Sequence, residues 1–337
     1  MKNSYISIVS GLIVLALTPA VWGVGAADNG PESERWIDLA GHRVPIVKDG
    51  LYDRYRSNPP LSEIAKESPA TDLTWFNTLD KTRVDMGFES YSPNFYYENT
   101  KVTVIYTADI HRLRELLPDI VSQQVQPLQI WPGRGLVALT AYAYHYCDND
   151  SYNEISLAIV TSKPGSLNLG PVSLINQTSD KDYWGYVLKL PVDTELARVR
   201  GVVGYNLPKW LTTIQYKEKS ASLVFDIADA DTGEVDFTLE TVRLTDLDEE
   251  PTLVNNSFIN IDQKGELTYG YAIFRHMLYG STLDDDAVKL TLGNGSFSKY
   301  LKSLQLGEML RYDYVPSFQS ALYAPKPLAE LYQTPIH

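Results

Sequence analysis

From about residue 100 onward, short apolar runs separated by polar turn residues dominate this chain. Some runs alternate apolar and polar positions, and others are continuously apolar, as in strands that are buried on one face or on both. This pattern predicts strands over residues 102–106, 136–146, 155–161, 184–190, 222–227, 234–242, 258–261, 267–271, 287–292 and 309–314.

Helical periodicity is confined to four short segments, at residues 61–65, 110–117, 194–199 and 297–304. Many short strands with few helices favour a mainly β fold in which a sheet closes into a barrel or nearly does so. Such a closure leaves a central cavity that can hold a small ligand. We therefore expect a β-barrel surrounded by further antiparallel strands.

The chain divides into three parts by composition. Residues 1–26 have a lysine near the start, an apolar core and a small-residue end at Val24-Gly25-Ala26, which is typical of a signal peptide. Residues 27–90 lack sustained periodicity and are interpreted as an N-terminal extension that wraps the main domain, residues 91–337. We expect an exported protein, periplasmic or extracellular, with no stable membrane span after cleavage, since a spanning helix needs about 20 apolar residues.

Charge and composition exclude several classes of function. The formal net charge of −13 over 337 residues, with no basic stripe, argues against a nucleic-acid partner. The five histidines show no paired metal spacing, so no metal site is predicted. No phosphate-binding glycine loop is present either. The remaining candidates are small-molecule chemistry and small-molecule binding.

One lysine stands in an apolar, aromatic setting. Lys209 follows Leu207-Pro208 and precedes Trp210. Burial disfavours the charged form of an amine, and a neutral amine can attack a carbonyl group to form a Schiff base. The alternative is a lysine that buries only its stem and keeps its ammonium group in water.

This segment resembles the active-site motif of the acetoacetate decarboxylase family, a glycine and an aromatic residue followed by Pro-Lys and a hydrophobic continuation. Residues 102–118 are similar to that family's early strand and following helix, and Tyr152-Asn153-Glu154 to its Tyr-x-Glu segment. Residues 297–328 are similar to its C-terminal region. The resemblance covers roughly residues 90–328 and implies the barrel fold, with residues 194–207 bringing the lysine into the cavity.

The resemblance also implies an activity. Lys209 would form the Schiff base, Glu154 would orient the substrate or move a proton, and a keto acid such as acetoacetate would lose carbon dioxide without an external cofactor. Candidate pocket walls are Trp210, Tyr205, Tyr144 and Tyr152. The expected partner is a small keto acid or ketone. The oligomeric state stays open, with a homo-oligomer as one option.

Several positions depart from the family pattern. No second lysine adjoins Lys209, so we assign activation of its amine to desolvation by Trp210 and Leu207. A second pocket glutamate is missing, with Thr140 the nearest match, and Arg198 and Arg200 are out of register with the family's Arg-Glu pair.

These departures leave two alternatives open. The same imine chemistry could serve aldol condensation, dehydration or hydrolysis, and the barrel could bind a small ligand without catalysis. His145, on the strand before Glu154, is a further candidate for the pocket.

Overall fold

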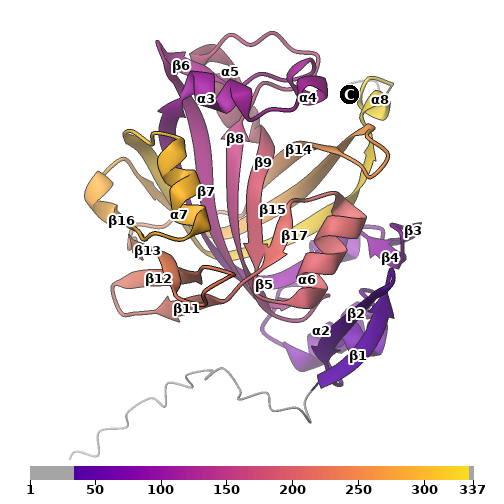
Figure 1. Ribbon diagram of the computed structural model, residues 1–337. Helices are drawn as coiled ribbons and strands as arrows, with labels where there is room; N and C mark the ends of the chain where they lie inside the picture. The colour runs from indigo at the N-terminus through magenta and orange to yellow at the C-terminus, as the bar shows by residue number, and fades with distance from the viewer. Residues whose placement is uncertain (1–33, 334–337) are drawn as a thin grey trace, which may run out of the picture. The chain divides into compact units, whose positions relative to one another are not determined.

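The computed structural model describes residues 34–333, so the expected signal peptide at residues 1–26 lies outside the described part. Its centre is a closed barrel with the strand order β9-β14-β15-β17-β5-β7-β8, in which β8 pairs back to β9 (Figure 1). Neighbours are antiparallel except for the parallel pair β9 and β14. The strands are β5 (Asn94–Asp109), β7 (Arg134–Cys147), β8 (Tyr152–Val160), β9 (Asp182–Val192), β14 (Thr252–Ile261), β15 (Leu267–Thr282) and β17 (Met309–Pro327). The predicted mainly β barrel is confirmed.

A second sheet packs against the outside of the barrel. Its order is β11-β12-β13-β16, and the helix α7 (Ser296–Ser303) lies beside it (Figure 1). The strands are β11 (Ile214–Glu218), β12 (Ser222–Ala228), β13 (Val235–Val242) and β16 (Val288–Leu292), and a short helix η4 (Asp285–Ala287) precedes β16. The main apolar core fills the space between this sheet and the barrel.

Strand β8 shows how the sequence places that core outside the barrel. Successive side chains of a strand point to opposite faces. Ile155 and Leu157 are fully buried in the core outside the wall, whereas Glu154, Ser156 and Ala158 line the barrel interior. The continuous apolar run in the sequence therefore reflects a strand covered on both faces.

Three helices gather at one end of the barrel, α3 (Ile110–Glu115), α4 (Asp119–Ser122) and α5 (Pro171–Asp180) (Figure 1). Leu174 and Thr178 of α5 line the barrel interior. The sequence prediction missed α5. The start of this helix nevertheless has a recognisable signal, a proline in the first turn, which follows Gly170 with φ 59°. Two further short elements are the edge strand β6 (Gln129–Trp131), which pairs with β7, and the helix α8 (Leu328–Leu331) near the C-terminal end of the described residues.

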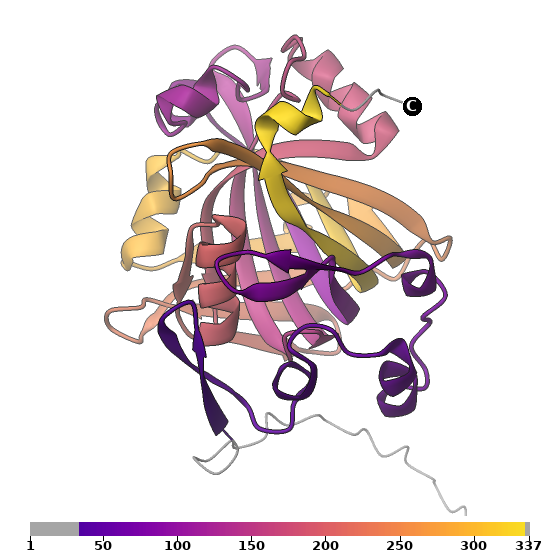
Figure 2. The ribbon, with the colours of Figure 1, turned by 90° about the vertical axis from the view of Figure 1, so that its right-hand side faces the viewer.

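Residues 34–92 form two hairpins with short helices between them, seen as the indigo segment of Figure 2. Their elements are β1 (Glu34–Leu39), β2 (His42–Val47), α1 (Leu51–Tyr55), α2 (Leu61–Glu67), η2 (Phe76–Thr78), β3 (Thr82–Asp85) and β4 (Glu89–Ser92). They belong to the same compact unit as the barrel. Two apolar clusters join them to it, one around Tyr52 and Leu190 and the other around Phe76 and Phe95.

The predicted strands are mostly present, but four of them are clearly too short in the prediction. Strands β5 and β14 were expected to begin only at residues 102 and 258, and the expected segments of β15 and β17 end at residues 271 and 314. The extra length carries polar residues such as Asn99, Lys101 and His276, which conceal the apolar alternation. Within residues 34–333, no helix has the length and apolar character that a membrane crossing requires.

Asp148 connects the N-terminal segment to the barrel. Its fully buried carboxylate accepts hydrogen bonds from Lys81 Nζ at 2.6 Å, from Phe95 N at 2.6 Å and from the Tyr97 hydroxyl at 2.7 Å. The Lys81 side chain is itself only 10% exposed. Each group compensates the other for its loss of water.

We predict that Asp148→Ala lowers the free energy of unfolding by about 3–5 kcal/mol, because it leaves the Lys81 ammonium group buried without its counter-charge. Thermal and denaturant unfolding would measure the loss. The control is Glu89→Ala, which removes an exposed ion pair with Arg83 and should change stability by less than about 1 kcal/mol. Equal effects of the two substitutions would contradict this account.

Candidate functional site

The segment before Lys209 is an unusual helix end. Helix α6 (Glu195–Val199) begins at Thr194, whose hydroxyl accepts from Ala197 N at 3.3 Å, and it continues into a π-helical turn, η3 (Arg200–Gly204). The chain then turns at Asn206, with φ 55°, and Leu207 N donates to Gly201 O at 3.0 Å. Irregular turns of this kind occur often at functional sites.

The short strand β10 (Lys209–Leu211) follows and pairs in parallel with β9. The Lys209 side chain crosses Gly201 so closely that a Cβ atom there would stand 2.6 Å from Lys209 Cε and closer still to Cδ. Only glycine therefore leaves room for the lysine stem.

The amine of Lys209 ends against a carboxylate. Lys209 Nζ lies 2.5 Å from Glu154 Oε2, and the two side chains are 6% and 9% exposed. Both line a barrel cavity of about 630 Å³. The structure thus brings together the two residues that the sequence singled out, 55 positions apart in the chain.

A group of tyrosines surrounds this pair. The Tyr144 hydroxyl donates to Glu154 Oε1 at 3.4 Å, the Tyr152 ring centre lies 5.6 Å from Lys209 Nζ, and the Tyr96 and Tyr152 hydroxyls are 3.0 Å apart. Burial raises the pKa of all three phenols well above the usual value, and the nearby Glu154 carboxylate adds to the effect. The phenols therefore stay neutral and serve as hydrogen-bond donors.

This arrangement can hold and transfer one proton. The pair exists either as an ammonium with a carboxylate or as a neutral amine with a carboxylic acid, and the second form is a nucleophile beside an acid. Within the described chain, no group of three or more His, Cys, Asp or Glu side chains is placed to hold a metal ion.

Solved structures show a similar architecture. The acetoacetate decarboxylase from Legionella pneumophila subsp. pneumophila str. Philadelphia 1 matches 70% of this chain and 87% of its own, with a TM-score of 0.51 and 12% identity. This chain has the acetoacetate decarboxylase fold. The enduracididine biosynthesis enzyme MppR in complex with pyruvate has a TM-score of 0.48 and 14% identity, over 70% of this chain and 91% of its own.

An acetoacetate decarboxylase-like enzyme from Sphingomonas wittichii RW1 has a TM-score of 0.42 and 15% identity, over 73% of this chain and 97% of its own. The Legionella match carries the fold assignment. At the level of sequence, no protein-family model and no curated protein matches this chain.

In this acetoacetate decarboxylase fold, two of the residues that were predicted to line the pocket do not line the barrel cavity. Trp210 follows Lys209 on β10 and so points to the opposite face, where its ring packs 5.5 Å from that of Phe297. Tyr205 is buried in an apolar cluster behind the barrel wall and does not line the cavity. The expectation that Trp210 shields the amine is therefore wrong, whereas Leu207 does line the cavity.

The other predicted residues differ in position. Tyr144 lines the cavity, while Tyr152 lies behind it and supports the Tyr144 ring at a centroid distance of 4.7 Å. His145 is exposed on the outer face of β7, where its Nε2 is 3.1 Å from the Thr100 hydroxyl, so it does not approach Lys209. Thr140, the nearest match to the missing second glutamate, lines the cavity.

Sequence reasoning missed several residues of the interior, Tyr96, Lys101, Tyr142, His276, Arg311 and Asp313. They lie on strands in which polar side chains conceal the alternation of apolar and polar positions. The only sequence signal for them was a charged or aromatic side chain within or next to a predicted strand. Arg200, set aside as out of register, is fully enclosed between the rings of Tyr52 and Phe88.

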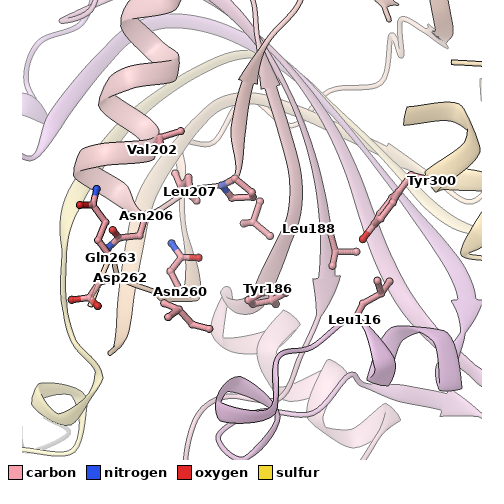
Figure 3. A pocket seen from close by; sticks show the side chains of 13 residues that line it. Leu116, Tyr186, Leu188, Val202, Asn206, Leu207, Asn260, Asp262, Gln263 and Tyr300 are labelled. Atoms are coloured by element: carbon pink, nitrogen blue, oxygen red, sulfur yellow. The ribbon is translucent and has the colours of Figure 1, made fainter. Parts of the chain in front are cut away.

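A second hollow of about 370 Å³ lies on the outside of the barrel, behind Leu207 and Pro208 (Figure 3). Asn206, Asp262 and Gln263 gather at one side of it, and Tyr300 stands at the other. Neither lysine nor histidine lines it. The Lys209–Glu154 pair therefore lies in the other cavity, inside the barrel.

We predict that Gly201→Ala reduces any reaction of Lys209 by at least about tenfold, since the new methyl group displaces the lysine stem from Glu154. Trapping of Lys209 by a ketone with borohydride, measured by intact mass, tests this. Val202→Ala, one residue further and facing the outer hollow, is the matched control and should react like the parent. Equal trapping in all three proteins would refute the proposed packing.

Proposed function

We propose that this protein is an exported, Schiff-base-forming lyase that uses Lys209 to decarboxylate a β-keto acid of the acetoacetate type. The observation that carries the proposal is the Lys209–Glu154 pair, 2.5 Å apart inside the barrel cavity. The fold shared with acetoacetate decarboxylase supports it. Export rests on the sequence pattern of residues 1–26.

The reaction begins with a proton transfer within the pair. Glu154 takes a proton from Lys209, and the neutral amine attacks the ketone carbon to form a carbinolamine. Glu154 then returns the proton to the departing hydroxyl group, which leaves as water, and an iminium ion remains. A carboxylate next to its own acid-base partner supports both transfers without any movement of the backbone.

The iminium ion draws electrons from the adjacent carbon. The bond to the carboxylate breaks, carbon dioxide leaves, and the electron pair moves into the nitrogen as an enamine forms. A proton added to the enamine carbon and a water molecule added to the iminium carbon release the ketone and restore Lys209. Neutral Tyr144, within hydrogen-bond reach of Glu154 Oε1 at 3.4 Å, holds the carboxylate in position during these steps.

One observation favours a competing function. The Lys209–Glu154 contact is a buried ion pair between complementary charges, and such a pair is also found in proteins without catalysis. A small-ligand-binding barrel would keep the pair intact and would need no free amine. Covalent trapping separates the two functions.

We predict that incubation of the protein with acetoacetate or levulinate, followed by borohydride reduction of the imine, leaves one adduct on Lys209. Peptide mapping would locate it. Lys209→Ala should abolish the adduct and the release of carbon dioxide, whereas Lys189→Met, on the outer face of β9, should retain both. An adduct on another lysine, or full turnover in Lys209→Ala, would overturn the mechanism.

Glu154→Gln should lower turnover by about 10²–10⁴-fold, the range of a lost acid-base group, while trapping at Lys209 persists at a reduced rate. Comparison of turnover, trapping rate and thermal stability on the same variant tests the role. Loss of stability with unchanged turnover would assign Glu154 to structure alone.

A further inference from the structure

A second lysine lies inside the same cavity. Lys101 on β5 is 5% exposed and lines the interior, and its Nζ sits 4.2 Å from the ring centre of Phe274 and 5.6 Å from that of Phe318. Within residues 34–333 its ammonium group makes no hydrogen bond and no ion pair. Burial lowers the pKa of Lys101 to about 8, so most of these side chains still carry a positive charge at neutral pH.

The carboxylate whose charge acts on Lys101, Asp313, already has other partners. Asp313 on β17 accepts from Arg311 Nε at 2.6 Å and from the Tyr279 hydroxyl at 3.0 Å. Its charge acts on Lys101 only through space. The lysine therefore has aromatic faces around it and lacks the anion that a buried ammonium group requires.

A second polar group in this region also lacks a partner. His276 on β15 is 7% exposed and lines the cavity, and its Nε2 has no hydrogen-bond partner. Burial and the neighbouring Lys101 lower the pKa of His276 to about 2, so the ring is neutral and can donate one hydrogen bond from Nε2 in the appropriate tautomer. Native proteins rarely leave such groups unsatisfied unless a ligand or water completes them.

The charges around the cavity point the same way. Four cationic side chains and three carboxylates line it, Lys101, Lys181, Lys209 and Arg311 against Glu154, Asp248 and Asp313. Lys209 is matched by Glu154, and Arg311 by Asp313. The cavity is thus left with one excess positive charge, although the whole chain has a formal net charge of −13. A local positive potential in a cavity attracts anionic ligands.

The barrel register fixes where Lys101 lies relative to Glu154. Lys101 is opposite Tyr142 on β7, and Tyr142 is opposite Glu154 on β8. Neighbouring strands are about 4.8 Å apart, so roughly 10 Å separates the two backbones along the wall. A ligand bound to Lys209 near Glu154 can therefore extend past Tyr142 toward Lys101.

We propose that Lys101 and His276 form an anion subsite that binds a carboxylate at the end of the substrate remote from its ketone. This inference rests on the proposed function, because it takes Lys209 as the residue that holds the ketone. The substrate class becomes a keto acid with an anionic group more than one methylene from the carbonyl, and for decarboxylation a β-keto diacid. The carboxylate that leaves stays by Lys209, and the second one pairs with the Lys101 ammonium group and accepts from His276.

The competing explanation is structural. Aromatic rings attract an ammonium group, and Phe274 together with Phe318 could compensate Lys101 without a ligand. That explanation predicts that Lys101 affects stability and has no influence on which ligands bind.

The test uses levulinate and its next two higher homologues, each paired with its neutral methyl ester, and measures the concentration for half-maximal borohydride trapping at Lys209. In the parent, at least one of the acids should trap at a concentration at least tenfold lower than its ester. Lys101→Met should erase this preference and leave ester trapping unchanged. Lys101→Arg should restore part of it, and His276→Phe should weaken it.

Lys189→Met is the control, because that lysine also lies over aromatic rings but on the outside of the barrel. Equal trapping of acids and esters by the parent, or a preference that survives Lys101→Met, would overturn the subsite. An absence of trapping with every ester would instead refute the role of Lys209. Should Lys101→Met fail to fold, the acid-to-ester ratio in Lys101→Arg and His276→Phe decides the question.

Discussion

The wall of this barrel is buried on both faces, and the rest of the structure depends on that constraint. The outer face packs against a second sheet and provides most of the apolar core. Because the core lies outside the barrel, the inner face does not have to be filled with apolar side chains. Small and polar residues at inward positions such as Ser156 and Thr140 leave a cavity where many barrels of this size are filled.

The proposed chemistry depends on the alternation of strand residues, which decides the side chains that face the cavity. On β10, Lys209 turns inward and Trp210 turns outward, where its half-buried ring packs against the main core and Phe297. The backbone that carries the amine is thus fixed by the core while the tip of the side chain stays in the cavity. The π-helical turn before it supplies Gly201, whose missing Cβ makes room for the lysine stem.

The sequence predicted the parts of the fold that have regular apolar spacing, including β7, β8, β9 and the short helices α3 and α6. It identified Lys209 and Glu154 through a resemblance, and the structure places them in contact. It could not place Trp210, because the direction of a side chain depends on the register of β10 with β9, which is a tertiary pairing. Lys101 and His276 were missed for a related reason, since a charged residue in a strand looks exposed until the strand is seen to close a barrel.

The size of the cavity has a consequence for its solvent. The cavity, at about 630 Å³, is many times larger than the volume of about 30 Å³ that one water molecule takes in the liquid, so it holds solvent. In the proposed mechanism, a four-carbon acid would fill only part of this space, and water in the rest would reach the iminium carbon soon after it forms. A longer molecule would expel more of this solvent from the aromatic and aliphatic lining, and the reactive intermediate would then meet water only when the product leaves.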